Sequence, residues 1–289
     1  MFKIKKLDKT IWPNGLFHIP VPPKNLSVRG LKNFQRLVNE DYKFLTIVGS
    51  RNFTDYGERV CQKIIPEIAN HKICLVSGMA YGIDSIIHRL AIDNQMATIA
   101  FPGSGLDDNV LYPKGNISLA YEILESGGSL ISEFEDFQEA RSWMFPQRNR
   151  LMVGISHSVL IIEAARKSGS GISANMAVDY NKNLMAIPGS IFNHNSEMTN
   201  ELISKGAFPV VCGQDILRIM NFEIVEETEL LDEKRKAGDI DQKLNTIEES
   251  ILNFIQNGMN DKEEILTKMK IPISEFNRAI TKLEIAGLL

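Results

Sequence analysis

The sequence predicts an α/β fold with a doubly wound, mainly parallel sheet, followed by a small helical domain. Six short apolar runs rich in Ile, Val and Leu each end in small or turn-forming residues. Amphipathic segments with apolar spacing near 3.6 residues separate these runs, and a charged stretch precedes a second amphipathic region. Buried parallel strands are nearly continuous apolar runs because helices cover both faces of their sheet. Alternation of such strands with helices is typical of doubly wound sheets.

The expected strands and helices follow one another along residues 43–225, which we predict to form one domain. The strands are predicted within six segments, 43–50, 73–78, 97–105, 127–133, 158–165 and 183–190. The helices between them are predicted over residues 55–68, 82–93, 117–126, 148–156 and 172–180.

Three further segments flank this domain or follow it. Residues 1–42 contain the stretch IPVPPKNL, whose adjacent prolines disfavour helix. We expect an extended N-terminal arm there, with a helical piece near residues 31–39. Residues 226–244 are strongly charged and predict a linker. Residues 245–289 predict three short amphipathic helices and a small winged-helix-like α domain.

Composition narrows the class of protein. The chain has no apolar run of the roughly 18–20 residues that cross a bilayer, and its basic start is not followed by an apolar signal core. We therefore expect a cytoplasmic protein that does not contact a membrane. The three cysteines are scattered and the five histidines are isolated, so we expect neither a disulfide framework nor a metal site.

The distribution of charge is more informative than its sum. The whole chain carries 32 basic and 36 acidic residues, a net charge of −4, which argues against general binding of nucleic acid. Residues 141–182 contain six basic and two acidic residues, a local charge of +4. The segment RSWMFPQRNR interleaves these bases with Trp143, which we expect in the core, and Phe145, which could either be core or stack on an unpaired base.

Glycine-rich turns follow four of the predicted strands, at residues 49–51, 77–82, 102–105 and 167–171. Glycine lets backbone N–H groups approach an anion, and a helix N-terminus adds partial positive charge. These turns could simply be tight connections, but four at one sheet edge favour a ligand that carries phosphate. Neither GxGxxG after the first strand nor GxxxxGK[ST] is present, which leaves a phosphodiester backbone as the expected ligand. The candidate DNA-binding residues are Gly49, Ser50, Arg51, Gly78, Gly103, Ser104, Gly105, Arg141, Phe145, Arg148, Arg150, Lys167, Ser168 and Ser170.

Other charged residues have structural interpretations that compete with ligand binding. We expect Arg51 and Arg148 to contact the ligand, whereas Arg150 could equally pair with Glu163 or another structural acid. Asp84 is expected to cap a helix. We find no GxSxG motif and no acid–base pair, so we expect no enzyme activity and no cofactor.

The motifs together resemble the DprA (Smf) family of DNA-processing proteins over about residues 16–220. The following segments occur in the order typical of that family: IVGSR, VSGMAYGIDSIIHRLAI, GSGLDDNVLYPKGN, SEFE, FPQRNRLMVGIS, EAARKSGSGISANMA, IPGS and MTNELISKGA. The resemblance implies an extended Rossmann-like fold that binds single-stranded DNA without sequence preference. It also implies a homodimer that loads RecA recombinase onto incoming DNA during natural transformation and recombination.

The same resemblance implies which residues form the DNA pocket. Carried over by motif, they are Arg51, Gly103, Ser104, Phe145, Arg148 and Lys167. Family members often carry a lysine at the position of Ser142, and Arg141 beside it is expected to substitute for that lysine.

Two alternatives stay open at this point. One is a Rossmann-like enzyme similar to phosphoribohydrolases that process nucleoside monophosphates; the matching stretch KSGSGISANM lacks the acid that such enzymes carry. The other is DNA binding by the C-terminal module. Its last predicted helix has Arg278 and Lys282 against Glu275 and Glu284, a neutral balance that favours a protein contact or an auxiliary role.

Overall fold

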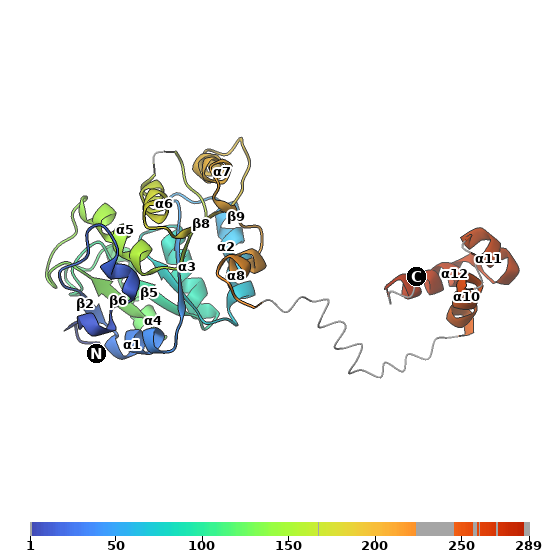
Figure 1. The fold of residues 1–289 in the computed structure, drawn as a ribbon, viewed down its shortest axis with the longest axis horizontal. Helices are drawn as coiled ribbons and strands as arrows, with labels where there is room; N and C mark the ends of the chain where they lie inside the picture. The colour runs from blue at the N-terminus through green and yellow to red at the C-terminus, as the bar shows by residue number, and fades with distance from the viewer. Residues whose placement is uncertain are drawn as a thin grey trace. The chain divides into compact units, whose positions relative to one another are not determined.

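The computed structural model divides the chain into two compact units, Met1–Ile224 and Val225–Leu289. Figure 1 shows the first as a sheet flanked by helices and the second as a small group of helices. The residues that the structure describes are 2–166, 168–223, 246–256, 259, 261–269 and 271–285.

The first unit contains a nine-stranded sheet in the order β1-β2-β6-β5-β4-β3-β7-β8-β9. Its strands are β1 (Lys5–Lys6), β2 (Ser27–Arg29), β3 (Lys43–Val48), β4 (Ile73–Ser77), β5 (Ala97–Ala100), β6 (Ser129–Ser132), β7 (Ser158–Ile161), β8 (Asn183–Ala186) and β9 (Phe208–Pro209). Neighbours from β6 through to β9 run parallel, whereas β2 pairs antiparallel with β6 and β1 with β2. The predicted doubly wound, mainly parallel sheet is confirmed, and β3 to β8 lie within the six predicted segments.

Helices cover both faces of this sheet (Figure 1). The helices of the first unit are α1 (Leu31–Asn39), α2 (Asp55–Ile68), α3 (Ile83–Asp93), α4 (Ile117–Glu125), α5 (Met144–Ile155), α6 (Gly169–Asp179), α7 (Glu197–Ser204) and α8 (Gly213–Ile219), with 3-10 turns at Lys9–Ile11, Asn14–Phe17, Lys114–Asn116 and His194–Ser196. One face packs on α1, α5, α6 and α7, and the other on α2, α3, α4 and α8. Along β3, Phe44 and Val48 join the first core, whereas Leu45 and Ile47 join the second.

Residues 1–42 differ from the extended arm that we expected. They form β1, β2 and the predicted helix α1, and their apolar side chains Trp12, Leu16 and Leu26 are buried in the main core. Strand β2 hydrogen-bonds to β6, so this segment extends the sheet by two strands. The strands are two and three residues long, too short to produce a recognisable alternation of apolar and polar residues.

The second unit contains three helices, α10 (Thr246–Gln256), α11 (Lys262–Met269) and α12 (Ile273–Ile285). Its core includes Ile251, Ile265 and Phe276, and Lys282 pairs with Glu248 at 3.2 Å. The three predicted helices are therefore present, and the winged-helix-like assignment remains a prediction. The expected linker over residues 226–244 lies outside the described residues. None of the helices in the described ranges is long and apolar enough to cross a bilayer.

Candidate functional site

A cleft of about 380 Å³ opens where the strand order reverses, between the carboxyl ends of β3 and β7. Its walls come from four places: the turn after β3, the start of α3, one side of α5 and the start of α6. Such a switch point is where open α/β sheets bind their ligands. Of the residues predicted from sequence, the cleft brings together Gly49, Ser50, Arg51, Phe145, Arg148, Ser168 and Ser170.

Phe145 presents a ring beside a cation at this cleft. The Arg51 guanidinium lies 5.4 Å from the centre of the Phe145 ring, and the Tyr112 ring centre lies 5.6 Å from it on a tilted plane. The ring packs against Gly103, where an added Cβ would collide with it. Gly103 therefore provides space for the ring. An exposed guanidinium over a half-buried ring offers a positive charge and an aromatic surface to the same ligand.

Arg148 supplies a second, buried cation to the cleft. Its guanidinium donates a hydrogen bond to the Phe101 carbonyl and covers Gly78, where a side chain would clash with it. Desolvation lowers the pKa of Arg148 to about 10, and the facing Asp84 carboxylate opposes that shift. A pKa of about 10 keeps the side chain charged at neutral pH. Gly78 therefore leaves space for the Arg148 guanidinium, as Gly103 does for the Phe145 ring.

Asp84 stabilises the loop before its helix. Its Oδ2 accepts hydrogen bonds from the backbone N–H groups of Gly78 (3.1 Å) and Ala80 (3.3 Å), whereas we expected it to cap the helix itself. Desolvation raises its pKa, and Arg148 acts in the opposite direction. Among the described residues that line the cleft, Asp84 carries the one carboxylate. The described cleft therefore holds no pair of carboxylates for general acid–base catalysis.

The N-terminus of α6 forms another wall of the cleft. Ser168 is its N-cap residue, and its side chain accepts no capping hydrogen bond, while the Ser170 hydroxyl donates to the Gly49 carbonyl at 3.1 Å. The first backbone N–H groups of this 11-residue helix carry partial positive charge at the cleft. Lys167, predicted to bind DNA, lies outside the described residues.

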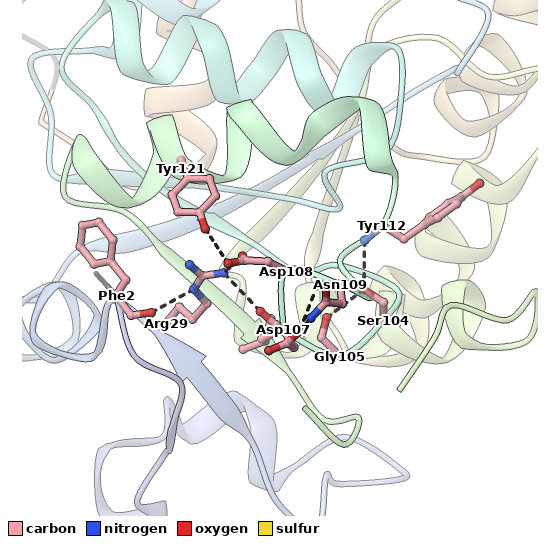
Figure 2. Close-up of polar contacts among 10 residues, drawn as sticks. Phe2, Arg29, Ser104, Gly105, Asp107, Asp108, Asn109, Tyr112 and Tyr121 are labelled. Atoms are coloured by element: carbon pink, nitrogen blue, oxygen red, sulfur yellow. Dashed lines mark hydrogen bonds and ion pairs between the residues drawn. The ribbon is translucent and has the colours of Figure 1, made fainter. Parts of the chain in front are cut away.

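Ser104 and Gly105 build the loop that supports Phe145 and do not line the cleft. The buried Ser104 hydroxyl donates to the Gly105 carbonyl (2.9 Å) and accepts from the Tyr112 N–H (3.2 Å). Figure 2 shows these contacts on one loop, with Tyr112 at its far end. The loop therefore holds the Tyr112 ring against Phe145.

Arg29, which sequence reasoning missed, anchors the same loop from the N-terminal segment. Its guanidinium pairs with Asp108 at 2.6 Å and donates to the Phe2 carbonyl at 3.2 Å. The Tyr121 hydroxyl donates to the other oxygen of Asp108 at 2.6 Å (Figure 2). Arg29 is 3% exposed. We did not predict this role, because we expected residue 29 to lie in an extended arm outside the sheet domain.

Two predicted arginines lie away from the cleft. Arg150 is buried in an ion pair with Glu133, not with Glu163, whose carboxylate accepts from the Thr54 hydroxyl. Arg141 is exposed just before α5. Trp143, which we expected in the core, is 49% exposed because it stands at the start of α5.

The cleft also contains residues that were not predicted. Asn149 and Met152 line it together with Phe145 and Arg148. These four share one side of α5, since positions three and four apart lie on the same side of a helix. That spacing could have identified Asn149 and Met152 from the sequence.

Comparison with known proteins gives one family. Residues 3–221 match the family model of DNA recombination-mediator protein A. Protein Smf of Escherichia coli K12 is 35% identical over 219 residues, which are 74% of this chain and 56% of that protein. DNA processing protein DprA of Streptococcus pneumoniae is 36% identical over 178 residues, 62% of each chain. The chain thus matches less than two thirds of the length of these two relatives.

Two solved structures are similar to this chain. The crystal structure of DprA from Streptococcus pneumoniae has a TM-score of 0.68 at 33% identity, covering 77% of this chain and 75% of that one. The structure that describes the single-stranded DNA binding mode of DNA processing protein A from Helicobacter pylori has a TM-score of 0.66 at 30% identity, covering 80% and 97%. With a family model matched over most of the sheet domain and a fold shared with both structures, the chain belongs to the DNA recombination-mediator protein A (DprA) family.

Proposed function

We propose that this protein binds single-stranded DNA without sequence preference, and that the cleft between β3 and β7 holds the strand. The observation that carries the proposal is the Phe145 ring with the Arg51 guanidinium 5.4 Å from its centre. A base that stacks on such a ring has its phosphate within reach of the cation. The Helicobacter pylori relative, whose single-stranded DNA binding mode has been described, supports the proposal.

The chemistry of the cleft favours an unpaired strand over a duplex. A base stacked on an aromatic side chain contributes about 1–3 kcal/mol, and every base has a face that can stack. Bases in a duplex already stack on one another, so their faces are not free. The contacts of the cleft are made by a ring, guanidinium groups and a helix N-terminus, and such groups bind any base and any phosphate.

Local charge explains how an acidic protein would bind a polyanion. The chain carries a net charge of −4, but the cleft sets Arg51 and Arg148 against one carboxylate among its described residues. The N-terminus of α6 adds partial positive charge to the same cleft. Binding should therefore weaken as salt rises, because phosphate contacts release counterions.

We further propose that the protein acts as a homodimer that loads RecA onto the bound strand and is not an enzyme. Membership of the recombination-mediator family supports a role in recombination. Large exposed apolar side chains follow the last two strands of the sheet and support self-association: Ile191 (82%) and Phe192 (94%) after β8, and Phe208 (48%) and Val211 (62%) in and after β9. The lack of an acid–base pair in the described cleft supports binding rather than catalysis.

The proposal is tested by fluorescence anisotropy with oligothymidylate and a duplex of equal length, at about 50 and 200 mM salt. We expect tighter binding of the single strand and weaker binding at high salt. Arg51→Ala should weaken binding and flatten its salt dependence, whereas Arg59→Ala, an exposed arginine on α2 outside the cleft, should leave both unchanged. Equal binding by both variants and the wild type would refute the site, and release of free base from adenosine monophosphate would refute the non-enzymatic assignment.

A further inference from the structure

A second pocket, of about 310 Å³, lies at the same edge of the sheet as the cleft. It is found where β6 ends beside the start of β2, since Ser132 and Ser27 are paired there. Its lining includes Lys24, Glu133, Gln147 and Arg150. It therefore contains the arginine that sequence analysis placed in the DNA site and that the cleft does not use.

One ion pair in the lining of this pocket is buried but only partly hydrogen-bonded. Arg150 and Glu133 form an ion pair whose side chains are 8% and 9% exposed. One atom of each, Arg150 Nη1 and Glu133 Oε1, has no hydrogen-bond partner among the described residues. Neither atom is exposed to solvent, although both side chains line the pocket. Buried polar atoms in folded proteins nearly always find partners, so an unpaired donor and an unpaired acceptor here indicate a place for a polar ligand that enters when the side chains around them move.

The ion pair sets an open donor and an open acceptor within one pocket. A group that completes both must itself offer an acceptor next to a donor. Each nucleobase shows that pattern on its Watson–Crick edge: thymine and guanine pair a ring N–H with a carbonyl, and adenine and cytosine pair an amino group with a ring nitrogen. In a duplex these edges are occupied by the partner strand.

We propose that the Arg150–Glu133 pair binds the Watson–Crick edge of an unpaired base of the strand held in the cleft. This inference rests on the proposed function. Arg150 Nη1 would donate to the acceptor of that edge and Glu133 Oε1 would accept from its donor. Because all four bases offer both groups, the subsite selects unpaired bases without selecting a sequence.

The position of the pocket relative to the cleft suits neighbouring nucleotides of one strand. Phe145 stands over Gly103, just after β5, and the pocket lies at the end of β6, the next strand of the sheet. Neighbouring strands are about 4.8 Å apart. On α5, Phe145 and Arg148 face the cleft, whereas Gln147 and Arg150 face the pocket. Helix α5 therefore lies between the Phe145 ring, on which one base would stack, and the Arg150–Glu133 pair, which would bind the edge of another.

The contact between Gln147 and the Glu133 carboxylate is one that a base could replace. Desolvation raises the pKa of Glu133, and Arg150 and the Gln147 amide oppose that shift. Gln147 is half-buried, so it can move aside when a base reaches the carboxylate. Trp143, one helical turn before Gln147 on the same side of α5, is 49% exposed and leaves an indole available beside this route.

The test compares oligothymidylate with an oligomer of N3-methylthymidine, which keeps the base face and the phosphates but loses the ring N–H. We expect the full-length protein to bind the methylated oligomer about tenfold more weakly, as loss of one hydrogen bond to a charged group implies. In Glu133→Gln this ratio should fall toward one, because the carboxylate acceptor is gone. Glu135→Gln, at the exposed rim of the same pocket, should keep the wild-type ratio.

A measurement on the unmodified protein covers the case in which Glu133→Gln does not fold, as judged by thermal unfolding. Oligothymidylate with 4-thiothymine carries the reactive sulfur on the Watson–Crick edge, so light should cross-link it to the peptide that contains Lys24, a residue of the pocket that does not line the cleft. Equal affinity for the two oligomers, or cross-links confined to peptides of the cleft, would overturn the subsite and leave the proposed function standing. No binding of either oligomer would overturn the proposed function, and the subsite with it.

Discussion

The guanidinium carbon of Arg51 lies 5.4 Å from the centre of the Phe145 ring, although the two residues are 94 positions apart in the sequence. Arg51 follows β3, at the centre of the sheet, and Phe145 belongs to the first turn of α5. The contact joins the turn after β3 to α5, the helix that connects β6 to β7. It also sets a charge and an apolar face side by side, and the first prediction separates their contributions.

Phe145→Leu should weaken binding of oligothymidylate and leave its salt dependence unchanged. The substitution keeps an apolar side chain over Gly103 but removes the stacking face, worth about 1–3 kcal/mol, or about 5- to 150-fold in Kd. Arg51→Ala should instead lower the slope of log K against log salt by about 0.7, the value for one phosphate contact on a single strand. Salt titrations by anisotropy measure both, and a changed slope in Phe145→Leu would contradict this division of roles.

Arg29→Lys should weaken DNA binding although Arg29 lies outside the cleft. The guanidinium bonds both Asp108 and the Phe2 carbonyl (Figure 2), and a lysine ammonium cannot reproduce that planar set of donors. We expect a stability loss of about 1.5–3 kcal/mol, the range for a hydrogen bond to a charged group, and greater mobility of the loop that carries Tyr112.

Hydrogen exchange across residues 104–112 and DNA affinity measure the consequence for Phe145. Lys32→Met, an exposed change in the same N-terminal segment, serves as the control and should alter neither. If residues 104–112 of Arg29→Lys exchange as slowly as in the wild type, and its Kd for DNA is also unchanged, then Arg29 does not position the site.

Buried His88 should make the fold less stable in mild acid. Desolvation lowers its pKa to about 3, with Arg148 nearby acting in the same direction, so the folded protein keeps it neutral while the unfolded chain takes up a proton below about pH 6.5. The unfolded state then binds more protons, and the free energy of unfolding decreases as pH falls from 6.5 toward 3, by up to about 1.4 kcal/mol per pH unit.

Urea unfolding at several pH values between 7.5 and 5 measures this slope. His88→Gln can still bond to Thr98, which His88 contacts at 2.7 Å. It should lower the slope of the free energy of unfolding against pH by up to about 1.4 kcal/mol per pH unit, the value for one proton. His18→Gln, at an exposed position, should leave it as in the wild type. An unchanged slope in His88→Gln would mean that another group takes up the proton.

Sequence reasoning succeeded for elements whose pattern is set by burial. Strands β3 to β8 are apolar throughout because helices cover both of their faces. Strands β1, β2 and β9 have two or three residues each, and no periodic pattern exists at that length. The start of α5 was placed at Arg148, after Pro146. The helix begins at Met144, and proline is tolerated there because the first helical turn lacks intrahelical N–H partners.

The site was harder to predict because it depends on which way each side chain points. Arg148 and Arg150 are two positions apart on one helix, a rotation of about 200°, so both could not face the same cleft. Helix geometry alone would have separated them once α5 was placed. The Arg29–Asp108 contact joins residues 79 positions apart, and neither composition nor spacing indicates such a pair.

Removal of residues 225–289 should leave the affinity for single-stranded DNA within about twofold of the full-length value. The described lining of the cleft lies within residues 48–173, and the first unit has its own core. In the described part of the last helix, Arg278 and Lys282 accompany Glu275, which provides no strong basic face. Anisotropy with the truncated chain measures the effect, and a large loss of affinity would assign DNA contacts to the second unit.

Phe192→Asp should convert the proposed homodimer into a monomer. Phe192 is 94% exposed and Ile191 beside it 82%, in the loop after β8, the strand that pairs with the edge strand β9. Exposed apolar side chains gathered at a sheet edge favour burial against a second copy of the same face, since a two-fold axis brings one patch onto itself. A charge at position 192 would have to be desolvated in such a dimer, which opposes association.

Light scattering coupled to size exclusion gives the mass of each variant. Val21→Asp, at an apolar position of the N-terminal segment that is 62% exposed, should remain dimeric. Because Phe192 is not among the described residues of the cleft, the monomeric variant should still bind a short oligothymidylate that occupies one cleft, with a Kd per chain near that of the wild type. It should bind less tightly to a strand long enough to occupy both clefts of a dimer, because the second contact then forms at high effective concentration. A wild-type protein that elutes as a monomer, or a Phe192→Asp variant that stays dimeric, would place the self-association surface elsewhere or remove it.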